Sequence, residues 1–513
     1  MGLPEEESAR RFAEFAAGLA DTIGNRVRCR HLKEYCTGLL LPGERKSVEP
    51  IAAKIAPDQA CAAHQSLLNH RCLPIFLGPE YGRIRGRTKM NPMDCDVLAS
   101  GGGMAGTVAA IAAAREGART VLFERHGFLG GAATAGAVGQ FVGWETRAGR
   151  RVIAGLAEEI VRRLEAMGGS GGHGHFVMST GHRMDRVEYD TEILKVVLDE
   201  MAHEAGVRVL LHSQLAQVSR RGRTITSTTL LTKGGMLDVR ARLFIDSSGD
   251  LDLMARAGAP FLGLDEGESL QPATMMFRLG PIDFSAFDGM SAETKAALSA
   301  RGVAEGALPR AALHCSRVPG SDDGWFNVTR ISIDASDPFA LSDGEREGRR
   351  QALGAARFIV ANVPGCSRAR LVSFAPQLGI RETRRIAGLL TLTADDLRQG
   401  AEFIDTMALG AYPIDVHHTG DGNITFDELG PDHVYALPYR IAVPQGLDNA
   451  LVAGRGLSAT HEAHGAIRVM PTAMAVAQAV GTAAALLAAA NRPTSQLDPA
   501  TLREKLRAAG AIL

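Results

Sequence analysis

The sequence has few cysteines and almost no net charge. Its seven cysteines include no C-x-x-C pair, which argues against an iron–sulfur cluster or a structural zinc site. Their scatter also argues against a disulfide framework and favours a reducing, cytoplasmic location. The net charge of −1 gives no general attraction to nucleic acid or to an anionic membrane. We therefore expect no bound metal and no nucleic-acid partner.

Signals for membrane insertion are also scarce. The N-terminal sequence MGLPEEESARRF is acidic where a signal peptide needs positive charge followed by an apolar run. One apolar stretch, Ala473 to Ala490, approaches the roughly 20 residues that a spanning helix needs. It consists largely of alanine and contains Gln478, so we predict a buried helix and no membrane span.

Glycine, in contrast, is abundant, with 58 residues in a chain of 513. This is well above the average of about 7% and is typical of nucleotide-binding α/β folds, which need tight turns and close backbone approaches. The length predicts two or three packed units.

A βαβ unit follows the clearest boundary in the sequence, at Met90–Asp94. A predicted strand, Asp96–Ser100, leads into glycines, then a helix at Met104–Glu116 and a second strand at Thr120–Phe123. Further along, Tyr189–Ala205 has the spacing of a helix, and strand-like segments lie at 207–212, 224–231 and 237–244. A strand at Asn449–Ala453 precedes the alanine-rich helix.

The glycines between the first strand and helix form a G-x-G-x-x-G motif. Gly101 permits a tight turn, Gly103 lets the backbone approach a pyrophosphate, and Gly106 lets helix and strand pack closely. Glu124 ends the second strand, where an acidic residue is expected to bind ribose hydroxyls. The motif predicts a bound dinucleotide but does not separate FAD from NAD.

Three later motifs favour FAD. Gly130-Gly131-Ala132 forms a second glycine loop after Arg125, and Asp246 to Asp250, with Gly249, follows a predicted strand. Near the C-terminus, Gly454-Arg455 ends a strand, and Arg468 precedes a helix that begins at Pro471-Thr472.

With these motifs, residues 94–513 resemble the FAD-dependent oxidoreductases of the glutathione-reductase-like superfamily, in the branch labelled heterodisulfide-reductase-like. The resemblance implies that Gly101, Gly103 and Gly106 hold the pyrophosphate and Glu124 the AMP ribose. It implies that Leu215 meets the adenine through its backbone, and that Asp250 lies near the ribityl-pyrophosphate. It places the start of the Pro471–Thr472 helix at the pyrimidine end of the flavin. We also expect cofactor contacts from Met104, Ala105, Arg125, Gly130, Gly131, Ala132, Asp246, Gly249, Gly454, Arg455 and Arg468. Because the chain has no cysteine cluster, we do not expect heterodisulfide reductase activity.

The expected fold is therefore α/β: a Rossmann-like FAD-binding domain with an inserted mixed α+β substrate domain and a short helical N-terminal extension. The predicted divisions are 1–90 for the extension, 91–254 and 441–513 for the FAD-binding domain, and 255–440 for the substrate side.

Candidate catalytic residues come from three segments. Arg384 lies in the arginine-rich motif Gly379–Ile386, His417 in Asp415–His418, and His461 and His464 in Ser458–Gly465. An arginine suits a carboxylate or polar substrate, and a histidine suits proton transfer near neutral pH. Equally, the arginines can pair with nearby acids or the FAD phosphates, and loop histidines often make structural hydrogen bonds.

The first ninety residues differ from the rest, with fourteen Lys and Arg against ten Asp and Glu. Two segments, 10–20 and 48–63, have helical spacing. The run Tyr35 to Pro50 resembles the N-terminal region of DDE-type insertion-sequence transposases, over roughly residues 10–70. The ribonuclease-H-like core that those enzymes need does not follow. We interpret the segment as a transposase fragment, with a helical accessory domain as the alternative.

Taken together, the sequence predicts an FAD-dependent oxidoreductase that exchanges a hydride between flavin N5 and a small-molecule substrate. It leaves open the substrate, the oligomeric state and the electron partner, which is oxygen, a quinone, a carrier protein or NAD(P)H. The alternatives are an NAD(P)-dependent dehydrogenase, an RNA-modifying flavoprotein, and a DNA-binding protein that uses the transposase-like segment.

Overall fold

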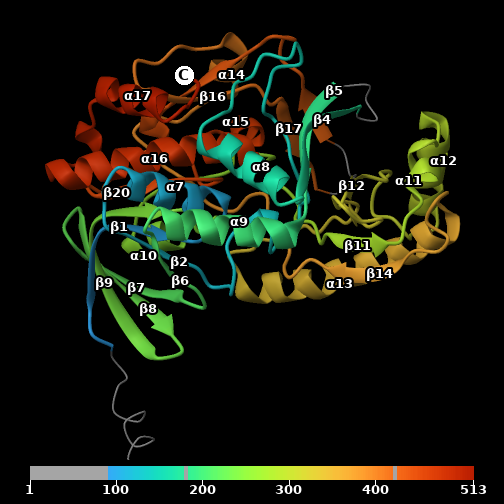
Figure 1. Ribbon diagram of the computed structural model, residues 1–513, viewed down its shortest axis with the longest axis horizontal. Coiled ribbons are helices and arrows are strands. Elements are labelled where there is room, and N and C mark those ends of the chain that lie inside the picture. Colours follow the sequence, from blue (N-terminus) through green and yellow to red (C-terminus); the bar gives the residue numbers. More distant parts are fainter. Residues whose placement is uncertain (1–89, 178–182, 420–423) are drawn as a thin grey trace, which may run out of the picture. The chain divides into compact units, whose positions relative to one another are not determined.

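The computed structural model of the protein describes residues 90–177, 183–419 and 424–513. Residues Lys89–Leu513 form one compact unit, shown in Figure 1. The predicted N-terminal helices and the transposase-like segment lie outside the described residues.

A sheet of mostly parallel strands forms the centre of this unit. Its strand order is β6-β2-β1-β9-β8-β7, and β20 pairs with the C-terminal half of β9. The parallel strands are β1 (Met93–Ser100), β2 (Thr120–Phe123), β6 (Arg208–Leu210), β9 (Gly235–Asp246) and β20 (Ala450–Val452); β7 (Gln214–Arg221) and β8 (Thr224–Thr232) complete the sheet. The βαβ unit and the strands predicted from the sequence are confirmed. Because the carboxyl ends of parallel strands meet at one edge, the loops after β1, β2, β9 and β20 converge there.

Two buried, alanine-rich helices pack against each other beside this sheet. They are α7 (Met104–Arg115) and α16 (Met470–Ala490) (Figure 1). A Cβ atom on Gly481 of α16 would lie 2.1 Å from the carbonyl oxygen of Ala109, so the helices approach each other closely. In the described residues, α16 is the one helix long and apolar enough to cross a membrane, but 78% of its apolar window is buried. The prediction of a buried helix is confirmed.

The predicted helix at Tyr189–Ala205 is wrong at its start. Tyr189 ends strand β5 (Arg183–Tyr189), and helix α9 covers Thr191–Glu204. The Asp190 side chain accepts hydrogen bonds from the backbone N–H groups of Glu192 and Ile193, which fixes the helix start after Tyr189. The Tyr189 ring is fully buried against Phe141, at 4.2 Å between ring centroids. Strand β5 lies between β3 (Gln140–Phe141) and β4 (Ser170–Val177) in a small sheet that the sequence did not predict.

A second hydrophobic core is built from residues between 273 and 378, together with Ala137. Its sheet has the order β12-β13-β11-β14, and the long helix α13 packs on it. The bounds are β11 (Phe277–Gly280), β12 (Cys315–Arg317), β13 (Gly324–Phe326), β14 (Arg370–Phe374), α11 (Phe284–Asp288), α12 (Ala292–Ala304) and α13 (Pro338–Asn362). Figure 1 shows these elements grouped at its right. This core covers only the middle of the 255–440 segment.

The residues after this core return to the first core. They include β16 (Thr406–Gly410), which pairs with β19 (Tyr435–Pro438), and β17 (Ile414–His417), which pairs with β18 (Ile424–Asp427). The remaining elements are α8 (Leu156–Ala166), α10 (Asp252–Ala257), β10 (Phe261–Leu262), β15 (Arg385–Ile386), α14 (Ala394–Gln399), α15 (His461–Ile467), α17 (Pro499–Ala508) and the short 3₁₀ helices η3 (Gly131–Ala133), η4 (Tyr439–Ala442) and η5 (Thr494–Gln496).

Candidate functional site

A cavity of about 270 Å³, open to solvent, lies where the strand-end loops converge. Its walls combine two sets of residues. One set comes from the strand-end loops and the start of α16: Gly103, Met104, Ala105, Gly130, Ala132, Ser247, Gly249, Gly454, Arg455, Arg468 and Met470. The other set includes Gln140, Thr274, Asn327, Arg381, Tyr412 and His417. The predicted cofactor motifs and polar residues from distant segments therefore face one space.

The first glycine loop has the geometry that its motif predicts. Gly101 has φ +93°, and a Cβ atom there would lie 2.6 Å from Cα of Ser248. A Cβ atom on Gly106 would lie 1.9 Å from the carbonyl oxygen of Gly101. On Gly103, in contrast, the nearest atom to a Cβ would be Cα of Gly131, at 3.9 Å. Gly101 and Gly106 are thus required by backbone packing, whereas Gly103 leaves room for a ligand.

The second glycine loop lies directly beside the first. Gly130 has φ +108°, and its N–H donates to the carbonyl oxygen of Gly102 at 2.8 Å. Gly130 and Ala132 line the cavity. Gly131 does not line it but packs against Gly103. The two loops form one continuous wall of the cavity.

Glu124 is buried at the end of β2 and holds the glycine loop. Its Oε2 accepts a hydrogen bond from the Gly102 N–H at 2.7 Å, and its Oε1 accepts from the His126 N–H at 2.9 Å and contacts His126 Nδ1 at 2.8 Å. Burial alone would raise the pKa of Glu124, but the hydrogen bonds from His126 and Gly102 outweigh it and hold this pKa below its usual value. An ionised carboxylate has about four acceptor positions, so it can also receive ribose hydroxyls. His126 was not predicted as a site residue, because its contact with Glu124 has no signal in the sequence.

Asp246 does not line the cavity but holds the loop that does. Its Oδ1 accepts from the backbone and side chain of Ser248, at 3.0 and 2.7 Å, and its Oδ2 accepts from the Met254 N–H at 2.9 Å. Burial raises the pKa of Asp246 to about 6. Asp246 therefore shapes the loop that presents Ser247 and Gly249 to the cavity.

Asp250 joins this loop to two other segments. Its Oδ1 accepts from Arg455 Nη2 at 2.6 Å and from Thr383 Oγ1 at 2.9 Å, and its backbone oxygen accepts from Arg384 Nη1 at 2.8 Å. Burial would raise the pKa of Asp250, but Arg455 holds it below its usual value. Arg455 lines the cavity, whereas Arg384 does not. The structure therefore places Arg384 behind the predicted pyrophosphate loop instead of among the substrate-side residues.

Unpaired polar groups in the cavity fit a polar ligand. The first N–H groups of α7 have no side-chain cap, nor have those of α16. Several polar atoms in the cavity wall are buried without a partner among the described residues: Gln140 Oε1, Asn327 Oδ1, Arg455 Nε and Arg468 Nε. Thr472 Oγ1, at the start of α16, is also buried without a hydrogen-bond partner among the described residues. Helix N-termini favour anions, so the residues present fit a pyrophosphate at α7 and an electron-rich ring at α16.

His417 lies on the substrate side with both ring nitrogens engaged. Arg330 Nη2 donates to Nδ1 at 3.3 Å, and Nε2 faces Asp415 Oδ2 at 3.2 Å. Because Arg330 can only donate, Nδ1 accepts and Nε2 carries the proton. Burial, together with the nearby Arg381, lowers the pKa of His417 to about 3. The geometry therefore holds His417 neutral, which makes it a hydrogen-bonding group rather than a ready proton carrier.

His461 and His464 form a buried cluster outside the cavity wall. The ring of His461 contacts Glu382 at 2.9 Å, and His464 Nε2 donates to the backbone oxygen of Arg455 at 2.9 Å. Arg385 pairs with Glu382 at 3.2 Å. Neither histidine lines the cavity, and His464 contacts the cavity wall through the backbone oxygen of Arg455.

The other predicted residues lie as follows. Leu215 is in β7, paired with Leu230, and does not line the cavity. Arg125 donates to Gln377 at 2.7 Å. Pro471 and Thr472 are buried in the first turn of α16 behind Met470. Arg381, Gln140, Asn327 and Tyr412 line the cavity but were not singled out by the sequence analysis.

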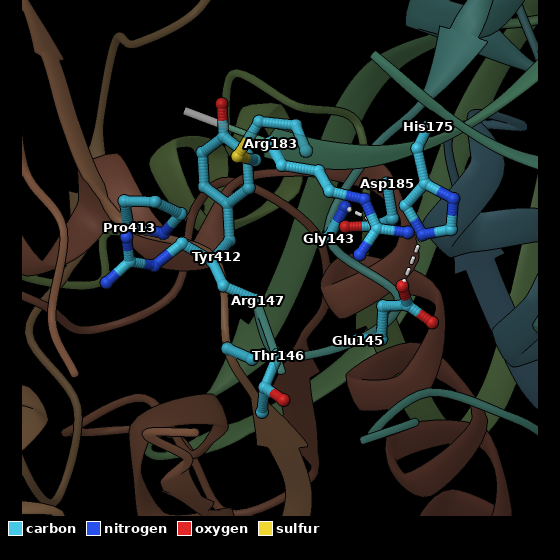
Figure 2. Close-up of a pocket in the computed structure, with 11 residues that line it drawn as sticks. Gly143, Glu145, Thr146, Arg147, His175, Arg183, Asp185, Tyr412 and Pro413 are labelled. Carbon is cyan, nitrogen blue, oxygen red and sulfur yellow. Dashed lines mark hydrogen bonds and ion pairs between the residues drawn. The ribbon is translucent and has the colours of Figure 1, made fainter. Parts of the chain in front are cut away.

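A second, much smaller pocket, with about 10 Å³ of space for water, shares Tyr412 with the large cavity. Figure 2 shows the pair of Glu145 and His175, 2.6 Å apart, on one side of it and Tyr412 on the other. Asp185 lies between them and accepts from the Trp144 N–H at 2.6 Å. Burial raises the pKa of Asp185. Asp185 thereby fixes the backbone that leads from the large cavity to the small one.

The comparisons with known proteins place the chain in a family. Among curated proteins, none matches the sequence significantly. Similar solved structures include a geranylgeranyl bacteriochlorophyll reductase-like protein from Thermoplasma acidophilum, with 14% identity, a TM-score of 0.41, and coverage of 82% of this chain and 83% of that one. Others are p-nitrophenol 4-monooxygenase from Pseudomonas putida DLL-E4 (12%, 0.42, 79% and 82%) and glycine oxidase from Geobacillus kaustophilus (13%, 0.37, 80% and 98%). The family described as FAD dependent oxidoreductase matches residues 96–506, which is most of the chain. The protein is thus an enzyme of the FAD-dependent oxidoreductase family, with FAD as its cofactor.

Proposed function

We propose that the enzyme exchanges a hydride between flavin N5 and a small polar molecule bound on the substrate side of the large cavity. The observation that carries this proposal is that the glycine loops and the residues Gln140, Arg381 and Tyr412 line one continuous cavity. When bound, FAD supplies the hydride acceptor or donor, which no side chain of the protein can replace.

The cofactor side divides into contacts and supports. We assign Gly103, Met104 and Ala105, with Gly130 and Ala132, to the pyrophosphate, and Glu124 to the AMP ribose. Leu215 remains our candidate for the adenine. The start of α16 would hold the flavin ring, with its partial positive charge favouring electron density there. Asp246, Asp250, Arg384, His461 and His464, which do not line the cavity, act as supports that fix these loops.

The substrate side offers orienting groups. Arg381 and the amides of Gln140 and Asn327 provide donors and acceptors, and Val138, Val142 and Met276 provide apolar wall. His417, held neutral between Arg330 and Asp415, fixes the position of Asp415 rather than accepting a proton from substrate.

The rival function, an NAD(P)-dependent dehydrogenase, needs only the βαβ unit at the N-terminal end. Here Gly454, Arg455 and Met470, from the C-terminal part of the chain, line the same cavity as Gly103. This arrangement supports FAD. The electron partner stays open, and the cytoplasmic location, the absence of a nucleic-acid partner and the transposase-like origin of residues 10–70 stay predictions.

The test begins with the purified protein and its visible spectrum. Releasing the chromophore by heat and identifying it by chromatography separates FAD from FMN. Anaerobic bleaching is then followed across a panel of candidate donors, with the Gly103→Leu variant as the control that lacks flavin. FMN, or well-folded protein without flavin, would overturn the proposal.

A further inference from the structure

Arginines gather on the substrate side of the large cavity. Arg381 and Arg468 line it, and Arg310 and Arg330 lie close enough to affect the Arg381 charge. Arg330 is bonded to His417 and to the backbone oxygen of His418, and Arg310 Nη2 donates to the backbone oxygen of Asn327 at 2.9 Å. The segments that supply these arginines are far apart in sequence, so the fold brings their positive charges together.

The acids of the described residues do not balance the charges of Arg381 and Arg310. Asp415 pairs with Arg468 at 3.3 Å and also with His417. Arg381 and Arg310 form no ion pair with any acid in the part of the chain that the structure describes. Burial and repulsion from other arginines lower the pKa of Arg381 to about 9, and the same two causes lower the pKa of Arg310 to about 10. A half-buried charge without an acidic partner is costly, so this wall is arranged for an anion that arrives from outside.

The guanidinium of Arg381 is fixed with one edge left open. Its Nη1 donates to the Thr274 hydroxyl at 2.8 Å and to the backbone oxygen of Pro272. Its Nε and Nη2 make no hydrogen bond to a described residue. These two groups form one edge of the planar fork, and that edge matches the two oxygens of a carboxylate.

The position of Arg381 separates it from the predicted pyrophosphate site. Arg381 is anchored beside Thr274, whose backbone pairs with Gly379, and it lies in the segment that borders the second core. Arg455, which lies beside the glycine loops, already has Asp250 as its partner. An anion at Arg381 is therefore best supplied by the substrate.

We infer that the substrate carries a carboxylate group, which the open Nε–Nη2 edge of Arg381 receives, with Arg468 and Arg310 adding to the attraction. This inference rests on the proposed function. The apolar residues Val138, Val142 and Met276 on the same cavity wall suit the carbon skeleton of such a molecule.

The test uses the flavin-loaded enzyme and small carboxylates as probes. Succinate and benzoate are titrated against it, each beside its neutral amide, and inorganic phosphate and sulfate form a further arm. The readout is the change in the visible spectrum of the bound flavin, which reports occupancy without turnover. We expect the carboxylates to perturb the spectrum and the amides to leave it unchanged.

Three variants locate the effect. Arg381→Met should weaken carboxylate binding about 10- to 100-fold, the range for a lost charged hydrogen bond, while the FAD content stays normal. Arg381→Lys keeps the positive charge but loses the planar fork, so its affinity for carboxylates should lie between those of Arg381→Met and the unaltered enzyme. The matched control is Arg346→Met, because Arg346 is exposed on α13 and pairs with Asp343. This variant should bind carboxylates as the unaltered enzyme does.

Four outcomes would overturn the inference: amides that bind as tightly as carboxylates, unchanged binding by Arg381→Met, a spectral response to phosphate or sulfate alone, and loss of FAD from Arg381→Met. The last would show that Arg381 holds the cofactor. Flavin content and reduction by dithionite are measured first on the unaltered protein. Absent FAD refutes the proposed function, whereas normal FAD without a carboxylate response refutes only this inference.

Discussion

Gly131 lies directly against Gly103, such that a Cβ atom on Gly131 would come within 2.8 Å of the Cα atom of Gly103. The φ of Gly131, +53°, adds to the requirement for glycine at this position. The second loop thus reaches the first only because Gly131 has no side chain. The two loops form the wall on which we place the pyrophosphate, and the glycines in this wall have different roles that substitution can separate.

Gly103→Leu should fold normally without FAD and fail to retain the cofactor. A side chain there meets no protein atom closer than 3.9 Å at its Cβ, so the rest of it enters the cavity. Gly106→Ala is the contrast, because its Cβ would lie 1.9 Å from the oxygen of Gly101 and so should lower the melting temperature of the FAD-free protein itself. Flavin content and FAD-free melting temperature are measured for both. Normal flavin content in Gly103→Leu would mean that this loop does not face the pyrophosphate.

Glu124→Ala should weaken FAD retention by about 1–3 kcal/mol, less than Gly103→Leu. The variant loses the acceptor for the Gly102 N–H as well as the carboxylate that we assign to the ribose. Equilibrium dialysis of FAD measures the loss. His126→Ala serves as the comparison, since it removes a partner of Glu124 while keeping the carboxylate, and should cost less. Equal affinity of Glu124→Ala and the unaltered protein would remove Glu124 from the cofactor site.

His464→Gln should flatten the pH dependence of stability between about pH 6 and pH 4. Burial lowers the pKa of His464 to about 3, whereas an unfolded histidine titrates near 6.5. Below pH 6.5 the unfolded chain therefore binds a proton that the folded protein does not, and the free energy of unfolding decreases by about 1.4 kcal/mol per pH unit as the pH falls. The variant lacks this contribution.

Urea denaturation at several pH values gives the two slopes, and their difference is the readout. The difference is needed because other buried groups titrate in the same window. His314 and His417, with pKa values lowered to about 4 and about 3, act in the same direction as His464. Asp246, with its pKa raised to about 6, acts in the opposite one. Parallel slopes for the variant and the unaltered protein would show that His464 is protonated in the folded state.

A chain that starts at Met90 should bind FAD and melt at nearly the temperature of the full chain. Residues Lys89–Leu513 form their own compact unit, β1 begins at Met93, and the family match begins at residue 96. Thermal melts with flavin quantification, run beside the full chain, check this. Aggregation or flavin loss in the shorter chain would show that the first 89 residues are a working part of the enzyme.

The cofactor side could be predicted from the sequence because its signals are local. Gly101, Gly103, Gly106 and Glu124 lie within one βαβ unit, where spacing alone fixes their places on strand, turn and helix. The substrate side depends on residues that lie far apart in the sequence, such as Gln140, Asn327 and Tyr412. These residues come together at the cavity only when the two hydrophobic cores pack.

The arginine-rich motif shows most clearly which site residues could not be predicted from the sequence. Arg381 and Arg384 are three residues apart, and the sequence pattern favoured Arg384 as the catalytic candidate. The pairing of Thr274 with Gly379 and the bond from Thr383 to Asp250 decide which arginine meets the cavity and which lies behind the loop. Neither contact has a sequence signal. The histidines of 461–464 were selected for their chemistry, but burial against Glu382 determines their surroundings.

The pairing of β20 with β9 joins residues about two hundred positions apart, Val452 beside Asp246 and Ala450 beside Phe244. During synthesis, at roughly 5–20 residues per second, the first glycine loop leaves the ribosome many seconds before β20 and α16 do. The cofactor pocket stays incomplete until nearly the whole polypeptide has emerged, so FAD capture becomes one of the last events in the maturation of this enzyme. Chains that end prematurely before α16 should therefore lack bound flavin.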